Sequence, residues 1–260
     1  MGPRATRDPA RHCRSARLAK THGRSPKCEP EVVDVAELLN LPGVEEACVI
    51  RSAVGFMALH GGSQDRGTDL IARRAAERAG ASYYGIIQPP GLRVHITSRL
   101  HRPEHSTVLH RFLQHIEVAI SIHGFGRDGF SLWVDPDRGL VIDPYGPPIR
   151  GRQTGPLTGI IVGGRNELLV NKARELFHER FEGFDVADPS LRLGYHPENP
   201  VNLPSSKGVQ IELPPGLRGI GPYGEQLVPS DTEEVAELVT ALVELAEFAS
   251  VTKGTPARRH

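Results

Sequence analysis

The sequence has few of the features that would place the chain outside a reducing, aqueous compartment. Its three cysteines, Cys13, Cys28 and Cys48, are too few and too unevenly placed for a disulfide framework. They form no CxxC pair that would suggest a structural zinc site. No run of 18 apolar residues occurs, and residues 1–30 contain no apolar stretch that could serve as the core of a signal peptide. We therefore expect a cytoplasmic protein without membrane contact. Cell lysis could release it.

An excess of charge of one sign is also missing. Lys and Arg together number 31, and so do Asp and Glu. With a formal net charge of zero, no overall field draws the chain to nucleic acid or to a membrane surface. A charged substrate would have to be recognised by local groups.

The two ends of the chain differ in composition from its middle. Residues 1–30 hold eight Lys or Arg against two acidic residues and almost nothing that could be buried, so we predict a disordered basic tail. This tail could contact nucleic acid, although a solvated extension explains its composition equally simply. Residues 253–260 are predicted to be a second disordered tail. A single domain over residues 31–252 remains, and α/β folds of this length commonly form one core.

Predicted strands and helices alternate through this domain. Apolar patterning predicts a hairpin or two short strands over residues 46–60, a hairpin over 132–144, and strands over 81–88, 92–98, 117–124, 157–164 and 207–213. Helices are predicted over residues 67–80, 103–116, 166–183 and 230–249. This order is typical of an α/β fold with a largely parallel or mixed sheet and helices on both faces.

Two histidines end predicted strands, and each is followed by glycine. His60 closes the strand that ends in "MALH", His123 closes "ISIH", and Asp65 follows His60 after the turn "GGSQ". Ligands of open α/β sheets bind beyond the carboxyl ends of the strands, and two His with one carboxylate are a common ligand set of catalytic zinc. The chain has 12 histidines, however, and a histidine that follows a strand is more often an ordinary polar residue. The pattern alone leaves both interpretations open.

A metal-dependent hydrolase also needs a general base, and Glu212 has a suitable position. In the strand "GVQIEL", Val209 and Ile211 share one face while Gln210 and Glu212 share the other. A carboxylate on a rigid strand near a bound cation could accept a proton from water. The alternative is that Glu212 lies at an exposed sheet edge.

Four blocks of the sequence together resemble one family. These blocks are "ALHGGSQDRGTDLIA", "ISIHGF", "IVGGRN" and "NPVNLPSSKGVQIELP", and in this order they resemble the poly-gamma-glutamate hydrolase family of bacteria and phages, over about residues 45–250. The resemblance implies a carboxypeptidase-like (phosphorylase/hydrolase-like) fold with a twisted mixed sheet. It also implies a zinc-dependent amidohydrolase that cleaves the γ-glutamyl amide bonds of poly-γ-glutamate.

The resemblance also implies roles for particular residues. His60, Asp65 and His123 would bind one Zn²⁺ per chain, and Glu212 would be the general base. The usual acid of the family at the position of Asp65 is Glu, which is longer by one methylene group. The backbone at Asp65 must therefore approach the metal more closely, or the affinity for the metal falls.

Further residues are candidates for substrate binding. Arg165 and Arg127 could stabilise an oxyanion or hold a substrate carboxylate, because a guanidinium binds carboxylates in a bidentate manner. Asn202 could donate a hydrogen bond to the substrate or serve a turn. Two other functions stay open, a related zinc N-acyl-amino-acid hydrolase or deacylase that acts on a small substrate, and a non-catalytic binding protein associated with nucleic acid.

Overall fold

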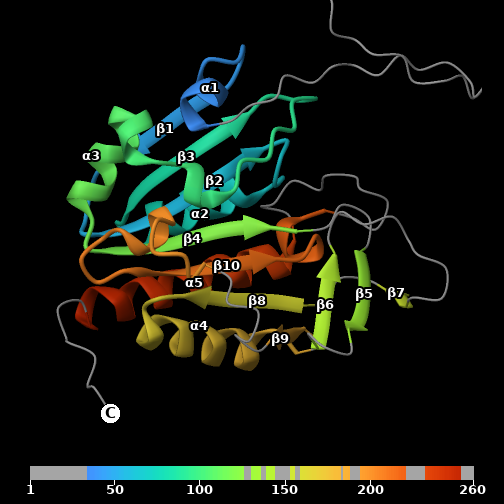
Figure 1. Ribbon diagram of the computed structural model, residues 1–260. Coiled ribbons are helices and arrows are strands. Elements are labelled where there is room, and N and C mark those ends of the chain that lie inside the picture. The colour runs from blue at the N-terminus through green and yellow to red at the C-terminus, as the bar shows by residue number, and fades with distance from the viewer. Residues whose placement is uncertain are drawn as a thin grey trace, which may run out of the picture. The chain divides into compact units, whose positions relative to one another are not determined.

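The computed structural model describes residues 34–125, 130–135, 139–143, 153–155, 159–182, 184–187, 194–220 and 232–252. Among these residues, seven strands form a mixed sheet in the order β1-β3-β2-β4-β10-β8-β9 (Figure 1). Its strands are β1 Glu45–Val49, β2 Val54–Gly62, β3 Ser82–Gln88, β4 Val118–Gly124, β8 Gly159–Gly164, β9 Asp185–Ala187 and β10 Gly208–Leu213. The predicted tails, residues 1–30 and 253–260, lie outside the described residues.

Helices cover both faces of this sheet, as predicted for the α/β class (Figure 1). On one face lie α2 Thr68–Arg78, α4 Glu167–Arg180 and α5 Glu233–Thr252, which share one buried apolar cluster with the strands. On the other face lie α1 Val35–Leu39 and α3 Thr107–His115, which pack in a second cluster. Because side chains alternate along each strand, one face of the sheet contributes its side chains to the first cluster and the other face to the second.

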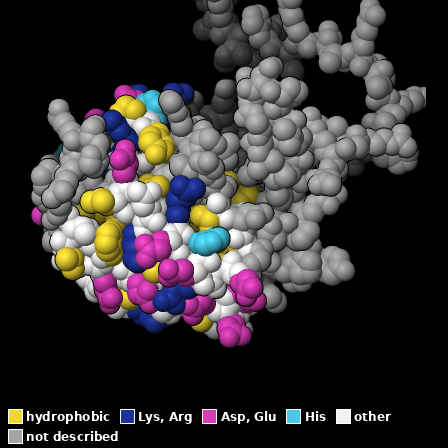
Figure 2. Space-filling view, turned by 90° about the horizontal axis from the view of Figure 1, so that it is seen from below, with side chains coloured by type: hydrophobic (Ala, Val, Ile, Leu, Met, Phe, Trp, Pro, Cys, Tyr) yellow, Lys and Arg dark blue, Asp and Glu magenta, His cyan; other side chains and the backbone are white. Residues whose placement is uncertain are grey.

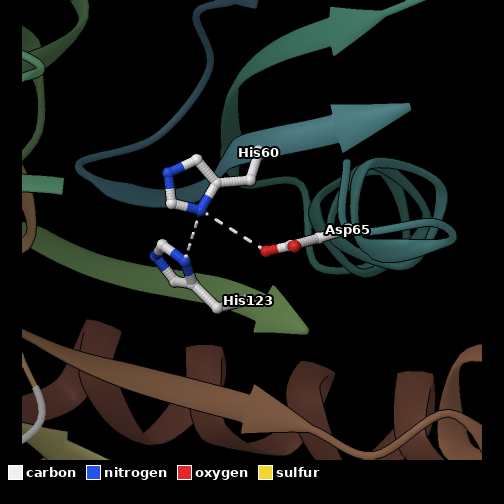
Figure 3. Close-up of side chains that lie close together, drawn as sticks. All are labelled: His60, Asp65 and His123. Carbon is white, nitrogen blue, oxygen red and sulfur yellow. Dashed lines mark hydrogen bonds and ion pairs between the residues drawn. The ribbon is translucent and has the colours of Figure 1, made fainter. Parts of the chain in front are cut away.

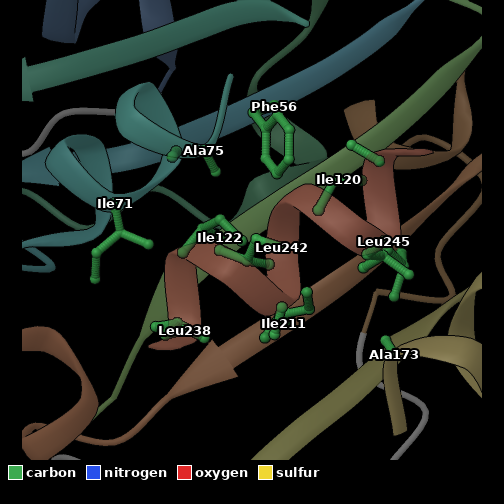
Figure 4. Packing of buried hydrophobic residues seen from close by; sticks show 14 of the residues in the cluster. Phe56, Ile71, Ala75, Ile120, Ile122, Ala173, Ile211, Leu238, Leu242 and Leu245 are labelled. Atoms are coloured by element: carbon green, nitrogen blue, oxygen red, sulfur yellow. The ribbon is translucent and has the colours of Figure 1, made fainter. Parts of the chain in front are cut away.

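Figure 4 shows the first of these clusters, in which the central strands pack against helices. Phe56 of β2, Ile120 of β4 and Ile211 of β10 point to the same face and meet Leu242 of α5. All four side chains are fully buried. Because alternate residues point to opposite faces, the neighbours of these residues along β4 and β10 are available for the other side of the sheet.

Side-chain caps explain where two of the predicted helices begin. The side chain of Asn166 accepts a hydrogen bond from the N–H of Leu169 at the start of α4, and Ser106 does the same for Leu109 at the start of α3. Such caps satisfy backbone donors that the first helical turn leaves without partners. The helix predicted over 166–183 therefore begins where expected and ends at Arg180.

The structure decides between the two alternatives for residues 46–60 and bears out the hairpin at residues 132–144. Residues 46–60 form two strands, β1 and β2, but not a hairpin, because β1 pairs with β3 in antiparallel fashion. The hairpin predicted over residues 132–144 is confirmed, since β5 Phe130–Asp135 pairs antiparallel with β6 Gly139–Asp143. These two strands and β7 Gln153–Gly155 form a separate sheet of the described residues.

The strand predicted over residues 92–98 is wrong, because this segment has no regular secondary structure up to the short 3₁₀ turn at Ser98. The side chain of Gln88 takes the place of a neighbouring strand. Its Nε2 donates to the carbonyl oxygen of Val94 at 2.7 Å, and its Oε1 accepts from the N–H of Val94 at 2.8 Å. The backbone polar groups of Val94 are thus satisfied without a sheet.

In the part of the chain that the structure describes, no helix is both long and apolar enough to cross a membrane. On the face seen in Figure 2, acidic, basic and hydrophobic side chains are interspersed. In this view the described residues form no large area of one charge, which agrees with the balanced composition.

Candidate metal centre

The structure brings His60, Asp65 and His123 together from three places in the chain (Figure 3). His60 lies on β2, His123 on β4, and Asp65 in the turn between β2 and α2. The Nδ1 atoms of the two histidines are 3.1 Å apart, and His60 Nδ1 is 3.4 Å from Oδ2 of Asp65. All three residues are buried.

An irregularity in β2 explains how His60 reaches this position. β2 pairs in parallel with β4, and Met57 lies beside Ser121, so His123 shares a face with Met57. Strict alternation would send His60 to the opposite face. Between Ala58 and Gly61, however, β2 holds one residue more than the paired segment of β3. Such a bulge re-aims a side chain, and here it turns His60 toward His123.

The outer ring nitrogens of both histidines have partners. Nε2 of His60 donates to the carbonyl oxygen of Ile96 at 2.7 Å, which leaves Nδ1 of the neutral ring with a lone pair directed into the centre. Nε2 of His123 lies 3.0 Å from the hydroxyl oxygen of Ser121. The carbonyl oxygen of Ile96 fixes the tautomer of His60, and the hydroxyl of Ser121, which can donate or accept, orients the ring of His123.

A tight turn brings Asp65 into the centre despite its short side chain. The N–H of Asp65 donates to the carbonyl oxygen of His60 at 2.7 Å, and the hydroxyl of Thr68 donates to the carbonyl oxygen of Asp65 at 2.8 Å. The N–H of Gly124 donates to Oδ2 of Asp65 at 3.1 Å. The backbone of Asp65 thus lies close to His60, which is one of the two outcomes expected for the shorter acid.

The electrostatics of the centre favour a positive charge between these side chains. Burial lowers the pKa of His60, but the hydrogen bond and the negative charge of Asp65 more than offset it, so this pKa is raised in net. Burial raises the pKa of Asp65, but His60 and other neighbours lower it in net. Burial and the charge of His60 lower the pKa of His123 to about 3. One carboxylate therefore faces two imidazoles that cannot both be protonated.

The geometry fits a zinc ion. Zn²⁺ lies about 2.0–2.2 Å from nitrogen and oxygen ligands, so two ligand atoms of a tetrahedral site lie about 3.4 Å apart. The observed separations of 3.1 and 3.4 Å are close to this value, and all three ligand atoms lie within 4.8 Å of one another. Two imidazole lone pairs at such a short distance repel unless a proton or a cation lies between them. The donor set therefore suits zinc.

Glu212 lies next to this centre on the adjacent strand. β10 pairs in parallel with β4, and the Cα atoms of Glu212 and His123 are partners in the register. Nε2 of Gln210 donates to Oε1 of Glu212 at 2.8 Å, so the two polar residues share a face as predicted. Burial, and then the negative charge of Asp65, raise the pKa of Glu212 to about 7.

The backbone of Arg165 lies away from these residues along the sheet. β8 runs antiparallel to β10, and Gly164 pairs with Val209, three residues before Glu212. The end of β8 therefore lies roughly 10 Å along the strand from Glu212. The prediction rested on the strand-end position of Arg165 and on the suitability of a guanidinium for carboxylates, and its contact with substrate stays a prediction.

Arg127 and Asn202 are the two other candidates for substrate binding. Arg127 lies outside the described residues. Oδ1 of Asn202 accepts from the N–H of Arg165 at 3.1 Å, and its Nδ2 donates to the carbonyl oxygens of Gly194 and His196. Asn202 is buried and ties two loops together, which agrees with the turn role. Its contact with substrate stays a prediction.

Sequence reasoning missed a cluster of histidine rings around His60. The ring of His95 has its centroid 4.9 Å from that of His60, and the ring of His101 has its centroid 5.3 Å away. His101 is fully buried, and burial together with the charge of His60 lowers its pKa well below the usual value. Both residues come from the irregular segment after β3, which carries no pattern that would indicate burial.

Comparison with known proteins supports the fold and the family resemblance. Residues 38–134 match the poly-gamma-glutamate hydrolase family, a stretch that contains all three candidate ligands. The structure of a bacteriophage poly-gamma-glutamate hydrolase is similar with a TM-score of 0.61 and 21% sequence identity, over 83% of this chain and 95% of that chain. The zinc-free apo form of YNDL is similar with a TM-score of 0.56 and 20% identity, over 78% of this chain and 89% of that chain. No curated protein matches the sequence.

Proposed function

Because the chain resembles the poly-gamma-glutamate hydrolase family in sequence and in fold, we propose that it is a zinc-dependent amidohydrolase that cleaves γ-glutamyl amide bonds of poly-γ-glutamate. The observation that carries this proposal is the convergence of His60, Asp65 and His123 within ligand distance of one another. The family match and the bacteriophage enzyme support the choice of substrate. The zinc-free form of YNDL supports the choice of metal.

His60 and His123 would hold the metal through Nδ1, and Asp65 through its carboxylate. A bound zinc ion would supply a water of lowered pKa and would polarise the carbonyl of the scissile amide. Ile96 and Ser121 hold the outer nitrogens of the two rings. The contact with Ile96 leaves a lone pair on Nδ1 of His60, and the contact with Ser121 orients the ring of His123 so that its Nδ1 faces the same place.

Glu212 would act as the general base and then as the general acid. Its raised pKa of about 7 lies near neutral pH, where a carboxyl group can both accept and release a proton. Gln210 occupies Oε1 of Glu212, so we assign Oε2 to the proton of the attacking water. The same carboxyl group would pass this proton to the leaving amine, which would otherwise depart as an unstable anion.

An assay on purified protein tests the substrate. Poly-γ-glutamate is incubated with the zinc-loaded chain, and its length is followed by gel filtration, with Glu212→Gln as the inactive control. The proposal expects shortening of the polymer by the wild type and a loss of at least 100-fold in Glu212→Gln, in the range of general acid–base contributions. Hydrolysis of N-acyl amino acids with an unchanged polymer would favour the small-substrate alternative. Full turnover by Glu212→Gln would exclude Glu212 as the base.

The nucleic-acid alternative depends on the basic tail, which lies outside the described residues. It stays a prediction, and it has its own test. Binding of nucleic acid that falls steeply with salt and vanishes on deletion of residues 1–30 would support it, because phosphate contacts release counterions.

A further inference from the structure

Arg218 is a buried cation close to the candidate centre. It ends the short 3₁₀ helix Gly216–Arg218 that follows β10, and only 2% of its surface is exposed. Its guanidinium donates to three backbone carbonyl oxygens. Nε donates to Leu213 at 3.1 Å, Nη1 to Arg66 at 2.9 Å, and Nη2 to Phe125 at 2.8 Å.

The three acceptors belong to three segments that are distant in sequence, and each lies next to a residue of the centre. Leu213 follows Glu212 and Arg66 follows Asp65 directly, while Phe125 lies two residues after His123. One planar group therefore joins the ends of β4 and β10 to the turn that carries Asp65. A buried charge of this kind is costly unless its donors are satisfied, and here three of its N–H groups are.

Gly124 couples the position of this guanidinium to that of the Asp65 carboxylate. The N–H of Gly124 donates to Oδ2 of Asp65 at 3.1 Å. A Cβ atom at Gly124 would lie 2.7 Å from Cζ of Arg218, so the guanidinium packs directly against this backbone. A shift of Arg218 would therefore move the donor that orients Asp65.

We propose that Arg218 is a positioning residue that holds Asp65, His123 and Glu212 in a common geometry and thereby sets the affinity of the centre for zinc. This role rests on the proposed function. Arg218 is buried beneath the centre's backbone and acts through these segments, not on the substrate. Lysine cannot replace it, because one ammonium group does not present donors in the fixed fork that three separated carbonyls require.

The test compares zinc affinity in Arg218→Lys and Arg218→Met with that of the wild type, by competition with a chromogenic chelator. Folding of each variant is checked by circular dichroism and by thermal unfolding in chelator. Arg180→Lys is the matched control, because Arg180 joins α4 to Glu237 and Glu244 of α5, away from the centre. We expect zinc affinity to fall about 10- to 100-fold in both Arg218 variants, as for other residues that orient metal ligands. Arg180→Lys should leave zinc affinity unchanged even where it lowers the melting temperature.

A second variant covers the case in which the Arg218 variants do not fold. Gly124→Ala keeps the cation but displaces it, and the same loss of zinc affinity is expected. Zinc affinity within twofold of the wild type in folded Arg218→Lys, or in Gly124→Ala, would overturn the role of Arg218. A wild-type chain that binds no zinc would overturn the proposed function, and the role of Arg218 with it.

Discussion

Gln210 donates a hydrogen bond from Nε2 to Oε1 of Glu212 at 2.8 Å. The orientation of the Gln210 amide is set by Asn199, whose Nδ2 donates to Oε1 of Gln210 at 2.9 Å. With its oxygen occupied by a donor, the amide must present its nitrogen to Glu212. Gln210 therefore favours the ionised carboxylate, and it lowers the pKa of Glu212 from the value that burial alone would give.

Gln210→Met should shift the pH dependence of activity. The substitution keeps the length of the side chain but removes the donor, so the pKa of Glu212 rises. Because the base must be ionised, activity should fall several-fold at pH 7 and approach that of the wild type at higher pH. The measurement is kcat/KM from pH 5 to 9, with Gln114→Met on the exposed side of α3 as control. If the rise of kcat/KM with pH were the same in Gln210→Met as in the wild type, this account would be contradicted.

Glu212→Gln should make the metal-free chain more stable at neutral pH. The pKa of Glu212 is raised in the folded state from 4.5 to about 7. Below pH 4.5 the carboxyl is protonated in both the folded and the unfolded state, so its burial causes no pH-dependent loss of stability. As the pH rises from 4.5 to 7, only the unfolded state ionises freely, so the folded wild type loses stability, and the loss is complete above about pH 7.

The expected difference between Glu212→Gln and the wild type is on the order of 1–3 kcal/mol at pH 8 and near zero at pH 4. Urea unfolding in chelator at both pH values measures it. Glu77→Gln, at an exposed position of α2, is the control. A gap of equal size at both pH values would show that the effect is not due to ionisation of Glu212.

Asp65→Glu should weaken zinc binding, even though the resemblance implies Glu at this position. The turn already places Oδ2 of Asp65 3.4 Å from His60 Nδ1 and in a hydrogen bond with Gly124. A side chain longer by one carbon–carbon bond, about 1.5 Å, would overshoot this position. We expect at least a 10-fold loss of zinc affinity in Asp65→Glu and no measurable binding in Asp65→Asn. Tighter binding by Asp65→Glu would show that the turn is not adapted to the shorter acid.

Two glycines with positive φ provide a matched pair for the bulged end of β2. Gly62 has φ 69° and Gly80 has φ 61°, so alanine strains the backbone equally at both sites, by roughly 1–2 kcal/mol. A Cβ atom at Gly62 would contact the backbone of Gln88 in β3, whereas Gly80 faces open space. Overpacking adds about 1–3 kcal/mol.

Gly62→Ala should therefore lower the free energy of unfolding by roughly 2–5 kcal/mol, and Gly80→Ala by roughly 1–2 kcal/mol. Because Gly62 lies two residues after His60, Gly62→Ala should also weaken zinc binding, while Gly80→Ala should not. Chemical unfolding and chelator competition measure the two effects. Equal losses of stability at both sites would argue against the packing of Gly62 on β3.

The sequence predicted those parts of the site that local pattern determines. Alternation in β10 placed Gln210 and Glu212 on one face, and the apolar strands before His60 and His123 indicated their place at strand ends. The bulge in β2 could not be predicted, because it is defined only by the register with β3. By strict alternation His60 would point to the wrong face.

Other parts of the structure depend on contacts that are distant in sequence. The position of Arg165 relative to Glu212 could not be predicted, because local pattern does not reveal that β8 runs antiparallel to β10. The segment after β3 reads as a strand, yet the side chain of Gln88 satisfies Val94 instead of a neighbouring strand. Arg218, in a loop rich in glycine and proline, gave no signal of its burial.

The most direct test is the zinc content of the wild type, His60→Ala and His123→Ala, measured by elemental analysis after loading and removal of free metal. His178→Ala, at an exposed position of α4, is the control for loss of a histidine elsewhere. The account predicts about one zinc ion per chain in the wild type and in His178→Ala, and almost none in the two site variants. Full zinc occupancy in folded His60→Ala and His123→Ala would contradict it.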